Sequence, residues 1–298
     1  MLGPLLFLIY INDLPLSTMN MKSVLFADDT TLFTTNTNIE NLSTVISNDL
    51  QRVNEWLTVN SLTLNIRKTY YIIFSNREVP NNLQIKLGQH TLERQNSGKF
   101  LGVILDEKLS FKEHIATTTN KVSKIVGLFY KLKKSFPLEI IYRLYYALIY
   151  PHLTYCLLAW GSAKPAYLHP LIMLQKRVAR IVTDSHYYAH SLPLFKRINM
   201  LKIDDMHMLA CQIFAFETLV LDKYPVSKEK ILNLQIQHTY ETRHTYLRNI
   251  YCRISLCKQS LTYNIIKAWN VLHEDVKKLT SLCMFKNTCK KVLIEKYC

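Results

Sequence analysis

Two adjacent carboxylates, Asp28 and Asp29, stand within a stretch of apolar and β-branched residues, VLFADDTTLF at 24–33. Like charges in a hydrophobic setting are costly unless a positive partner holds them. Residues 24–27 and 30–33 are typical of strands, so the sequence predicts a β-hairpin with both acids at its tip. On the hairpin alone, an exposed acidic turn and a Mg²⁺ site of carboxylate oxygens are equally open.

The charges are distributed unevenly along the 298-residue chain, whose net charge is +15. Residues 1–100 hold eight basic and eight acidic residues, whereas residues 101–298 hold 29 basic and 14 acidic residues. This asymmetry favours a polyanionic partner, most simply nucleic acid, over a generic lysine-rich surface. Only six glycines are present, and neither G-x-G-x-x-G nor a Walker loop occurs, which argues against a glycine-rich phosphate loop.

The seven cysteines are odd in number and lack the spacing of a disulfide framework, which predicts a reducing compartment. We therefore expect an intracellular protein of the cytoplasm and nucleus. Cys252 and Cys257 lie near His238 and His244, which raises the possibility of zinc. The C-x₄-C spacing is loose, however, so buried thiols are the favoured interpretation.

The first third of the chain predicts an α+β module. Its expected elements are a helix opened by the capping box Thr37-x-x-Glu40, strands at 70–74 and 99–105, and a hairpin that turns at Gly88-Gln89. The apolar face expected for the helix consists of Leu42, Val45, Ile46, Leu50, Val53, Trp56 and Leu57. Periodicity leaves the apolar run at 4–11 open between helix and strand.

From Ser110 onward the apolar spacing changes to a helical period. Helices are expected from the capping box Ser110-x-x-Glu113 to residue 132, from Pro137 onward, and at 168–183, 200–221 and 260–296. Residues 223–258 show no strong period. The nearly uncharged stretch 144–160 is cut by Pro151, so it predicts two short buried helices and not a membrane span.

Four segments in this order resemble the reverse transcriptase of non-LTR (LINE-like) retrotransposons, most like the jockey-type clade. They are LGPLLFLIYINDLP, VLFADDTTLF, LTLNIRKTYYIIFS and KFLGVILDEKLSF. One such motif would be weak, but four in sequence are specific. The resemblance implies an α+β fold with a partial reverse-transcriptase palm at 1–106, a helical thumb-like region at 107–185 and a basic helical C-terminal region at 186–298.

The resemblance also implies roles for residues of the palm. Asp28 would ligate two Mg²⁺ (or Mn²⁺) ions, with Asp29 beside it, and the ions would bridge the primer 3′ oxygen and the triphosphate of the incoming nucleotide. Ala27 is small, which would let the primer end approach. Lys68 matches a lysine that approaches the triphosphate, although a surface lysine at a strand end is an equally open interpretation. Gly3 and its neighbours match the motif that backs the template and the incoming base.

Further residues would contact nucleic acid. Phe100, Leu101 and Gly102 resemble the primer grip, with an ordinary β-bulge glycine as the alternative. A helical bundle with a basic face suits an RNA–DNA hybrid. Its candidate cations, each of which could also be plain solvated surface, are Lys131, Lys133, Lys134, Lys176, Arg177 and Arg180. The implied partners are an RNA template, a DNA primer and deoxynucleotide triphosphates.

A family palm needs a further Asp from a strand that precedes the residues matching Gly3. Because the chain starts at Met1, we expect a fragment that does not polymerise by itself. The alternative is a non-catalytic nucleic-acid-binding remnant. A weaker alternative comes from residues 99–145, part of which resembles a segment of AlkB-type tRNA dioxygenase–methyltransferases. His273-Glu274-Asp275 has the H-x-D spelling of an iron site, but no histidine follows it.

Overall fold

The structure, a computed structural model, describes residues 2–79, 83–232, 247–248 and 250–297. Its chain divides into two units: the first contains Met1–Lys99 and Asp106–Leu109, and the second contains Phe100–Leu105 and Ser110–Cys298. The boundary expected from the sequence between 185 and 186 lies inside the second unit. The division into 1–106, 107–185 and 186–298 therefore stays a prediction, and each unit is described by itself.

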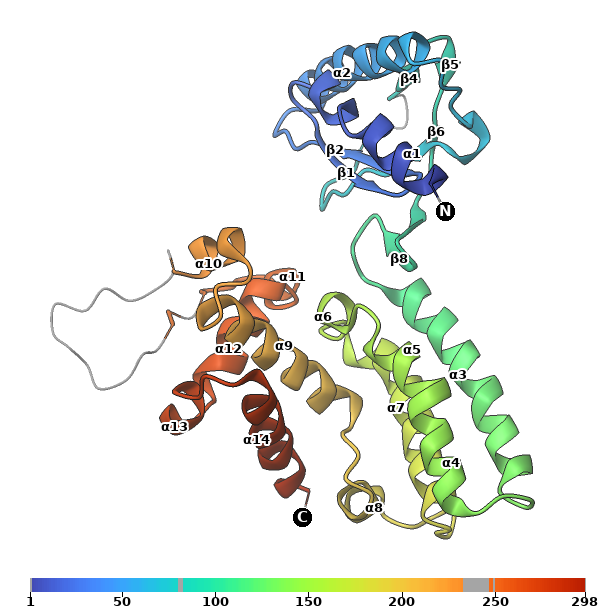
Figure 1. Cartoon of the computed structure of the whole chain (residues 1–298), viewed down its shortest axis with the longest axis vertical. Coiled ribbons are helices and arrows are strands. Elements are labelled where there is room, and N and C mark those ends of the chain that lie inside the picture. The colour runs from blue at the N-terminus through green and yellow to red at the C-terminus, as the bar shows by residue number, and fades with distance from the viewer. Residues whose placement is uncertain (1, 80–82, 233–246, 249, 298) are drawn as a thin grey trace, which may run out of the picture. The chain divides into compact units, whose positions relative to one another are not determined.

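The first unit opens with a helix, a hairpin and a long helix (Figure 1). Their bounds are Gly3–Ile11 for α1, Lys22–Phe26 for β1, Asp29–Phe33 for β2 and Ile39–Val59 for α2, with a short 3-10 turn, η1, at Leu14–Ser17. The run at 4–11, which periodicity left open, is helical, and Pro4 in its first turn suits a helix start. The helix predicted after Thr37 is confirmed, although it begins at Ile39.

Helix α2 buries its predicted apolar face in two small clusters. One consists of Ile11, Leu14 and Val53, with Leu25 and Leu32 of the hairpin packed against it. The other consists of Leu50, Ile85, Leu87 and Leu92. Val53 belongs to the cluster with the hairpin, and Leu50 belongs to the cluster with Ile85 and Leu87. Helix α2 therefore packs against both the hairpin and the strands that come after α2 in the chain.

The remaining strands of the first unit are very short. They are β3 at Tyr70–Tyr71, β4 at Lys86–Leu87, β5 at His90–Thr91 and β6 at Glu93–Arg94, preceded by a 3-10 turn, η2, at Ile66–Lys68. The predicted hairpin at Gly88 is confirmed, because Leu87 pairs with His90 and Gly88 has a φ of 58°. The prediction of a buried strand at 70–74 is wrong in extent: only two residues pair, in parallel with β6, and Phe74 is exposed.

The strand predicted at 99–105 is a hairpin in the structure. β7 at Ser97–Phe100 pairs with β8 at Val103–Asp106. The two residues between them, Leu101 and Gly102, have φ of 44° and 90°. A two-residue turn with positive φ at both central positions matches the right-handed twist of the flanking strands, and it reverses the chain where a single strand was expected.

The second unit is helical apart from Phe100–Leu105. Its elements are α3 (Lys112–Leu132), α4 (Leu138–Leu144), the π-helical η3 (Tyr145–Ile149), α5 (Tyr150–Thr154), α6 (Leu157–Trp160), α7 (Pro165–Val182), α8 (Ser191–Arg197), α9 (Ile203–Leu219), α10 (Pro225–Leu232), α11 (Ser255–Lys258), α12 (Leu261–Asn270), α13 (Glu274–Lys277) and α14 (Leu282–Glu295). The helices predicted at 110–132, 168–183 and 200–221 are confirmed as α3, α7 and α9.

Two predictions for the second unit need correction. The helix expected at 260–296 is three helices, because the backbone is extended at His273 (ψ 148°) and at Ser281 (ψ 122°), where new helices begin. The first α-helical residue after Ser110 is Lys112, preceded by Phe111 at φ 56°, so the capping box does not form as expected. The stretch 144–160 consists of short segments as predicted, and no helix among the described residues is long and apolar enough to cross a membrane.

Helices α3 and α7 pack against each other and run in parallel (Figure 1). The Lys112 ammonium lies 6.0 Å from the Tyr167 ring near the start of both helices. Lys133 forms an ion pair with Asp184 just beyond the end of both. Phe129 of α3 and Val178 of α7 are fully buried in the large core that extends through the second unit to α14.

Candidate catalytic hairpin and basic surface

The two acids of the hairpin occupy different positions. The last paired residues of β1 and β2 are Phe26 and Asp29, so the turn consists of Ala27 and Asp28. Ala27 has a φ of 52°, as the first central residue of a primed two-residue turn requires. The expectation that both acids form the tip is therefore half right: Asp28 is in the turn, and Asp29 is the first residue of β2.

The hairpin has one buried and one exposed face. Leu25 and Leu32 pack on the core with α2. Asp29 lies opposite Phe26, which belongs to the other face and is 62% exposed. Because side chains alternate along a strand, Asp29 belongs to the exposed face of the hairpin. Asp28 lies in the turn, next to Asp29. Both carboxylates are exposed.

A third acid, Asp49 of α2, holds the chain that leads into the hairpin. Its carboxylate is fully buried and accepts hydrogen bonds from the N–H groups of Asn20 and Met21, each at 2.7 Å. Burial raises the pKa of Asp49, but the N–H donors of Asn20, Met21 and Met19 and the Arg52 guanidinium outweigh that effect, so the pKa lies below its usual value. Asp49 therefore positions β1, which begins at Lys22.

Sequence reasoning missed Asp49. The sequence did contain a sign of it: an acid lies among Ile46, Leu50 and Val53, which are spaced along α2 so that they pack into the hydrophobic clusters. A charged residue on such a face needs a partner. The partners are backbone N–H groups, which carry no mark in the sequence.

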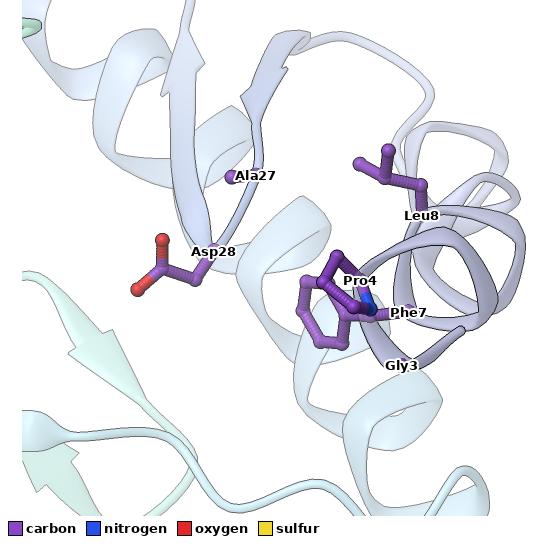
Figure 2. A pocket seen from close by; sticks show the side chains of 6 residues that line it. All are labelled: Gly3, Pro4, Phe7, Leu8, Ala27 and Asp28. Atoms are coloured by element: carbon purple, nitrogen blue, oxygen red, sulfur yellow. The ribbon is translucent and has the colours of Figure 1, made fainter. Parts of the chain in front are cut away.

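A pocket of about 330 Å³ lies between the start of α1 and the hairpin turn (Figure 2). Its lining residues are Gly3, Pro4, Phe7, Leu8, Ala27 and Asp28. The Asp28 carboxylate points away from Pro4 and Phe7, so it stands at the rim of an apolar pocket. The structure thus brings Gly3 and Pro4, singled out from the first motif, next to the Asp28 of the second.

The donor set at this hairpin suits Mg²⁺ in type but is small. Mg²⁺ prefers oxygen ligands, commonly binds through one or two carboxylates and keeps several waters. Asp28 and Asp29 provide two exposed carboxylates, and no cluster of three or more His, Cys, Asp or Glu occurs among the described residues. Lys68 is exposed at the end of η2 and is not among the described residues that line the pocket.

The residues likened to a primer grip belong to the second unit. The Tyr155 hydroxyl donates a hydrogen bond to the carbonyl oxygen of Leu101, and a Cβ at Gly102 would lie 3.2 Å from the Tyr155 ring. Gly102 is thus a turn glycine held against Tyr155, and the β-bulge interpretation is wrong. A role in primer binding for Phe100, Leu101 and Gly102 stays a prediction.

The candidate cations gather at the C-terminal ends of α3 and α7. Lys131, Lys134 and Arg177 are exposed. Lys176 is half-buried. The expectation that Arg180 turns to solvent is wrong, because it is half-buried and its Nε donates a hydrogen bond to the carbonyl oxygen of Ala189 at 3.0 Å. Lys133 is likewise engaged, in its ion pair with Asp184.

The zinc hypothesis falls partly outside the described residues, because His238 and His244 lie there. Cys252 and Cys257 are half-buried, and a hydrogen bond that the Cys252 thiol donates to Cys257 is the main reason that the pKa of Cys252 is raised. A thiol that gives up its proton less readily is a poorer metal ligand.

Comparison with known proteins now decides the family resemblance. Residues 1–105 match the family model of the reverse transcriptase (RNA-dependent DNA polymerase). The first third of the chain is similar to reverse transcriptases. The match covers α1, the hairpin, α2, Lys68 and the pocket, so every residue placed near Asp28 lies within it.

Curated relatives extend this similarity beyond residue 105. A probable RNA-directed DNA polymerase from transposon X-element of Drosophila melanogaster is 24% identical over 68% of this chain and 23% of its own length. The RNA-directed DNA polymerase from mobile element jockey of Drosophila funebris is 23% identical over 84% of this chain and 28% of its own. A probable RNA-directed DNA polymerase from transposon BS of Drosophila melanogaster is 26% identical over 68% of this chain and 24% of its own length.

The chain spans about a quarter of the length of the curated relatives it matches. The predicted resemblance to jockey-type reverse transcriptases is confirmed, and the jockey alignment is long enough to include much of the helical second unit. No solved structure matches the chain.

Proposed function

We propose that this chain supplies part of the palm and the following helical region of an RNA-directed DNA polymerase of a non-LTR retrotransposon. The reaction would be nucleotidyl transfer onto a DNA primer paired with an RNA template. One observation carries the proposal: the pocket between the start of α1 and the hairpin has the Asp28 carboxylate at its rim. The reverse-transcriptase match over residues 1–105 supports it.

In this proposal Asp28 and Asp29 hold Mg²⁺ or Mn²⁺. Bound metal ions would neutralise charge on the triphosphate and on the primer 3′ oxygen. The small side chain of Ala27 leaves space beside Asp28, and Pro4, Phe7 and Leu8 form an apolar wall on that side. Asp49 keeps the hairpin in place from below through the backbone of Asn20 and Met21.

The partners proposed are an RNA template, a DNA primer and deoxynucleotide triphosphates. The second unit would hold the template–primer duplex through phosphate contacts from exposed cations such as Lys131, Lys134 and Arg177. Phosphate contacts bind without reading sequence, which suits a polymerase that must accept any template. We place this activity inside the cell, in the cytoplasm and nucleus.

Primer extension tests the proposal. Two metal ions carry four positive charges, and two carboxylates offset half of them, so we expect residues 1–298 by themselves not to extend a primer. Joined to the upstream palm residues of a jockey-type relative, they should extend a DNA primer on RNA. Asp28→Asn should then reduce extension on the order of a hundredfold or more, because the reacting atoms lose their alignment.

The matched control is Glu78→Gln, which removes an exposed carboxylate of the same unit that does not line the Asp28 pocket. Extension by that variant should equal the parent. Extension that survives Asp28→Asn would refute the role of the hairpin.

A second candidate function is non-catalytic nucleic-acid binding. Its support is the charge asymmetry, since the whole net charge of +15 lies after residue 100. The same extension assay separates the two functions: binding of template–primer without any extension, even in the joined protein, would favour the non-catalytic role.

A further inference from the structure

The loop between α7 and α8 exposes two neighbouring aromatic rings. Tyr187 is 57% exposed and Tyr188 is 83% exposed. Their rings meet edge to face, with centroids 5.2 Å apart and an interplanar angle of 88°. The His186 ring lies 5.5 Å from the Tyr188 ring on the same loop. The largest aromatic surface of this loop therefore faces solvent.

Hydrogen bonds fix the backbone that presents these rings. The N–H of Ser185 donates to the carbonyl oxygen of Arg180 at 3.0 Å, and the N–H of Ala189 donates to that of His186 at 2.9 Å. The Arg180 guanidinium closes the loop through Ala189 at 3.0 Å. A ligand that binds here meets a surface already ordered, so little conformational entropy is lost on binding.

A cation of α3 contacts the base of the loop. Lys133 of α3 pairs with Asp184, which is the only acid between α7 and α8. This ion pair joins the loop to the end of α3, where Lys131 and Lys134 are exposed. Because Lys133 neutralises Asp184, no unpaired carboxylate of the loop opposes an anionic ligand.

We propose that Tyr187 and Tyr188 form a stacking platform for an unpaired base of single-stranded nucleic acid, whose phosphates contact Lys131 and Lys134. An aromatic ring stacks on the face of any base, and exposed rings beside cations are the combination that single-strand binding uses. A base in a duplex hides its faces against its neighbours, which makes a single strand the better match. The site needs no polymerase activity, so it goes beyond the proposed function.

Fluorescence anisotropy with the 298-residue chain tests the platform. The probes are fluorescein-labelled oligothymidylate and oligouridylate of about 12 nucleotides, within the usual site size of such proteins. The buffer contains EDTA and no nucleotide triphosphate. Tyr188→Leu should weaken binding of both probes about tenfold, as loss of one stacked base does. Tyr188→Phe keeps the ring and should bind within about twofold of the parent.

The matched control is Tyr251→Leu, which removes a tyrosine of the second unit that is 87% exposed. Its affinity should not change. Equal losses from Tyr251→Leu and Tyr188→Leu would overturn the proposal, as would parental affinity of Tyr188→Leu. Equal weakening by Tyr188→Leu of the binding of a blunt duplex of the same length would also overturn it, because a duplex has no unpaired base to stack on the ring.

A proximity measurement does not depend on any variant. Oligouridylate containing 5-iodouridine, irradiated on the parental chain, should crosslink to the peptide that contains residues 184–190. A crosslink located only elsewhere would refute the platform. Because neither assay involves metal or nucleotide triphosphate, their failure would leave the Asp28 extension experiment as it stands.

Discussion

Asp28 is exposed at the end of the hairpin because Ala27 adopts the positive φ that a two-residue turn needs. Non-glycine residues rarely adopt this conformation, and it costs free energy. The turn sets Asp28 beside the pocket while Asp29 stays in the strand register opposite Phe26. Local backbone geometry, and not the Asp-Asp pair as such, therefore decides which carboxylate meets the pocket.

Metal binding at the hairpin can be measured without catalysis. We expect Mn²⁺ to broaden the backbone amide signals of Ala27, Asp28 and Asp29 in an NMR spectrum of the 298-residue chain, because carboxylate oxygens bind this ion. Asp28→Asn should abolish the broadening, and Glu78→Gln should leave it. Broadening that persists in Asp28→Asn, or that is equally strong along exposed acids elsewhere, would favour a bare acidic turn.

Asp49 makes the first unit sensitive to acid. We expect Asp49→Ala to destabilise the chain by about 2 kcal/mol, because two backbone N–H groups lose a charged acceptor. The folded pKa lies below that of the unfolded chain, so the carboxylate contributes stability above about pH 4 that is lost as pH falls through the folded pKa. Urea unfolding of the parent and Asp49→Asn from pH 6 to pH 3 measures this.

In the parent the loss of stability below pH 4 should exceed that of Asp49→Asn, whose amide does not titrate. Parallel stability curves for the two proteins would show that Asp49 contributes nothing through its charge.

At the scale of elements, sequence pattern predicted what repeated apolar spacing determines. α2 was predicted with its buried face, and α3 as a helix, because several apolar residues recur at helical intervals. The turn at Leu101-Gly102 was not predicted, because it depends on the φ of two residues held by Tyr155, more than fifty positions away. The segment before Pro151 was expected to be helical, but its π-helical form was not predicted, because apolar spacing does not reveal how the N–H that proline lacks changes the helical ladder.

For the candidate site, too, the sequence predicted which residues matter but not how distant segments pack together. The types and order of residues located Asp28 and Asp29, and the resemblance located Gly3 beside the incoming base. The sequence could not show that Gly3 and Asp28 share one pocket, which depends on how α1 packs near the hairpin. Nor could it show that Arg180 and Lys133 are engaged by Ala189 and Asp184, since both look like free cations of a helix face.

Two glycines in helical surroundings should respond oppositely to alanine. A Cβ at Gly161 would lie 2.7 Å from the carbonyl oxygen of Leu157 and 2.4 Å from the His207 ring, so Gly161→Ala should destabilise by about 1–3 kcal/mol. Gly127 is exposed within α3, with nothing within 4 Å of its Cβ position. Gly127→Ala should stabilise by about 0.5–1 kcal/mol.

Thermal unfolding followed by circular dichroism compares these two variants with the parent. Equal midpoints for Gly161→Ala and Gly127→Ala would contradict the close packing of Gly161 against α9.

At the scale of the whole molecule, buried imidazoles link the pH of the medium to the stability of the second unit, and His207 is the clearest case. Burial lowers the pKa of His207 to about 4. The unfolded chain binds this proton at about pH 6.5, so stability should fall as pH drops from about 6.5 towards 4, by about 3 kcal/mol in total. His207→Leu should remove the part of this dependence that comes from His207 and leave the part that comes from His114, whose pKa burial also lowers. His169→Gln, at an exposed position of α7, should keep all of it.

The charge distribution of the chain makes a separate prediction about nucleic acid. Each phosphate contact releases a counterion, so the logarithm of the affinity should fall with the logarithm of salt concentration by about 0.9 per contact. The balanced charge of residues 1–100 predicts that the phosphate contacts come from the second unit.

Replacing Lys131 and Lys134 by Gln should therefore reduce the salt slope of RNA–DNA hybrid binding by the amount that about two phosphate contacts contribute. Replacing Lys22 and Lys86, exposed lysines of the first unit, should leave the slope unchanged. Anisotropy across a salt series gives both slopes, and equal flattening by the two pairs would mean that charge asymmetry does not decide where the duplex binds.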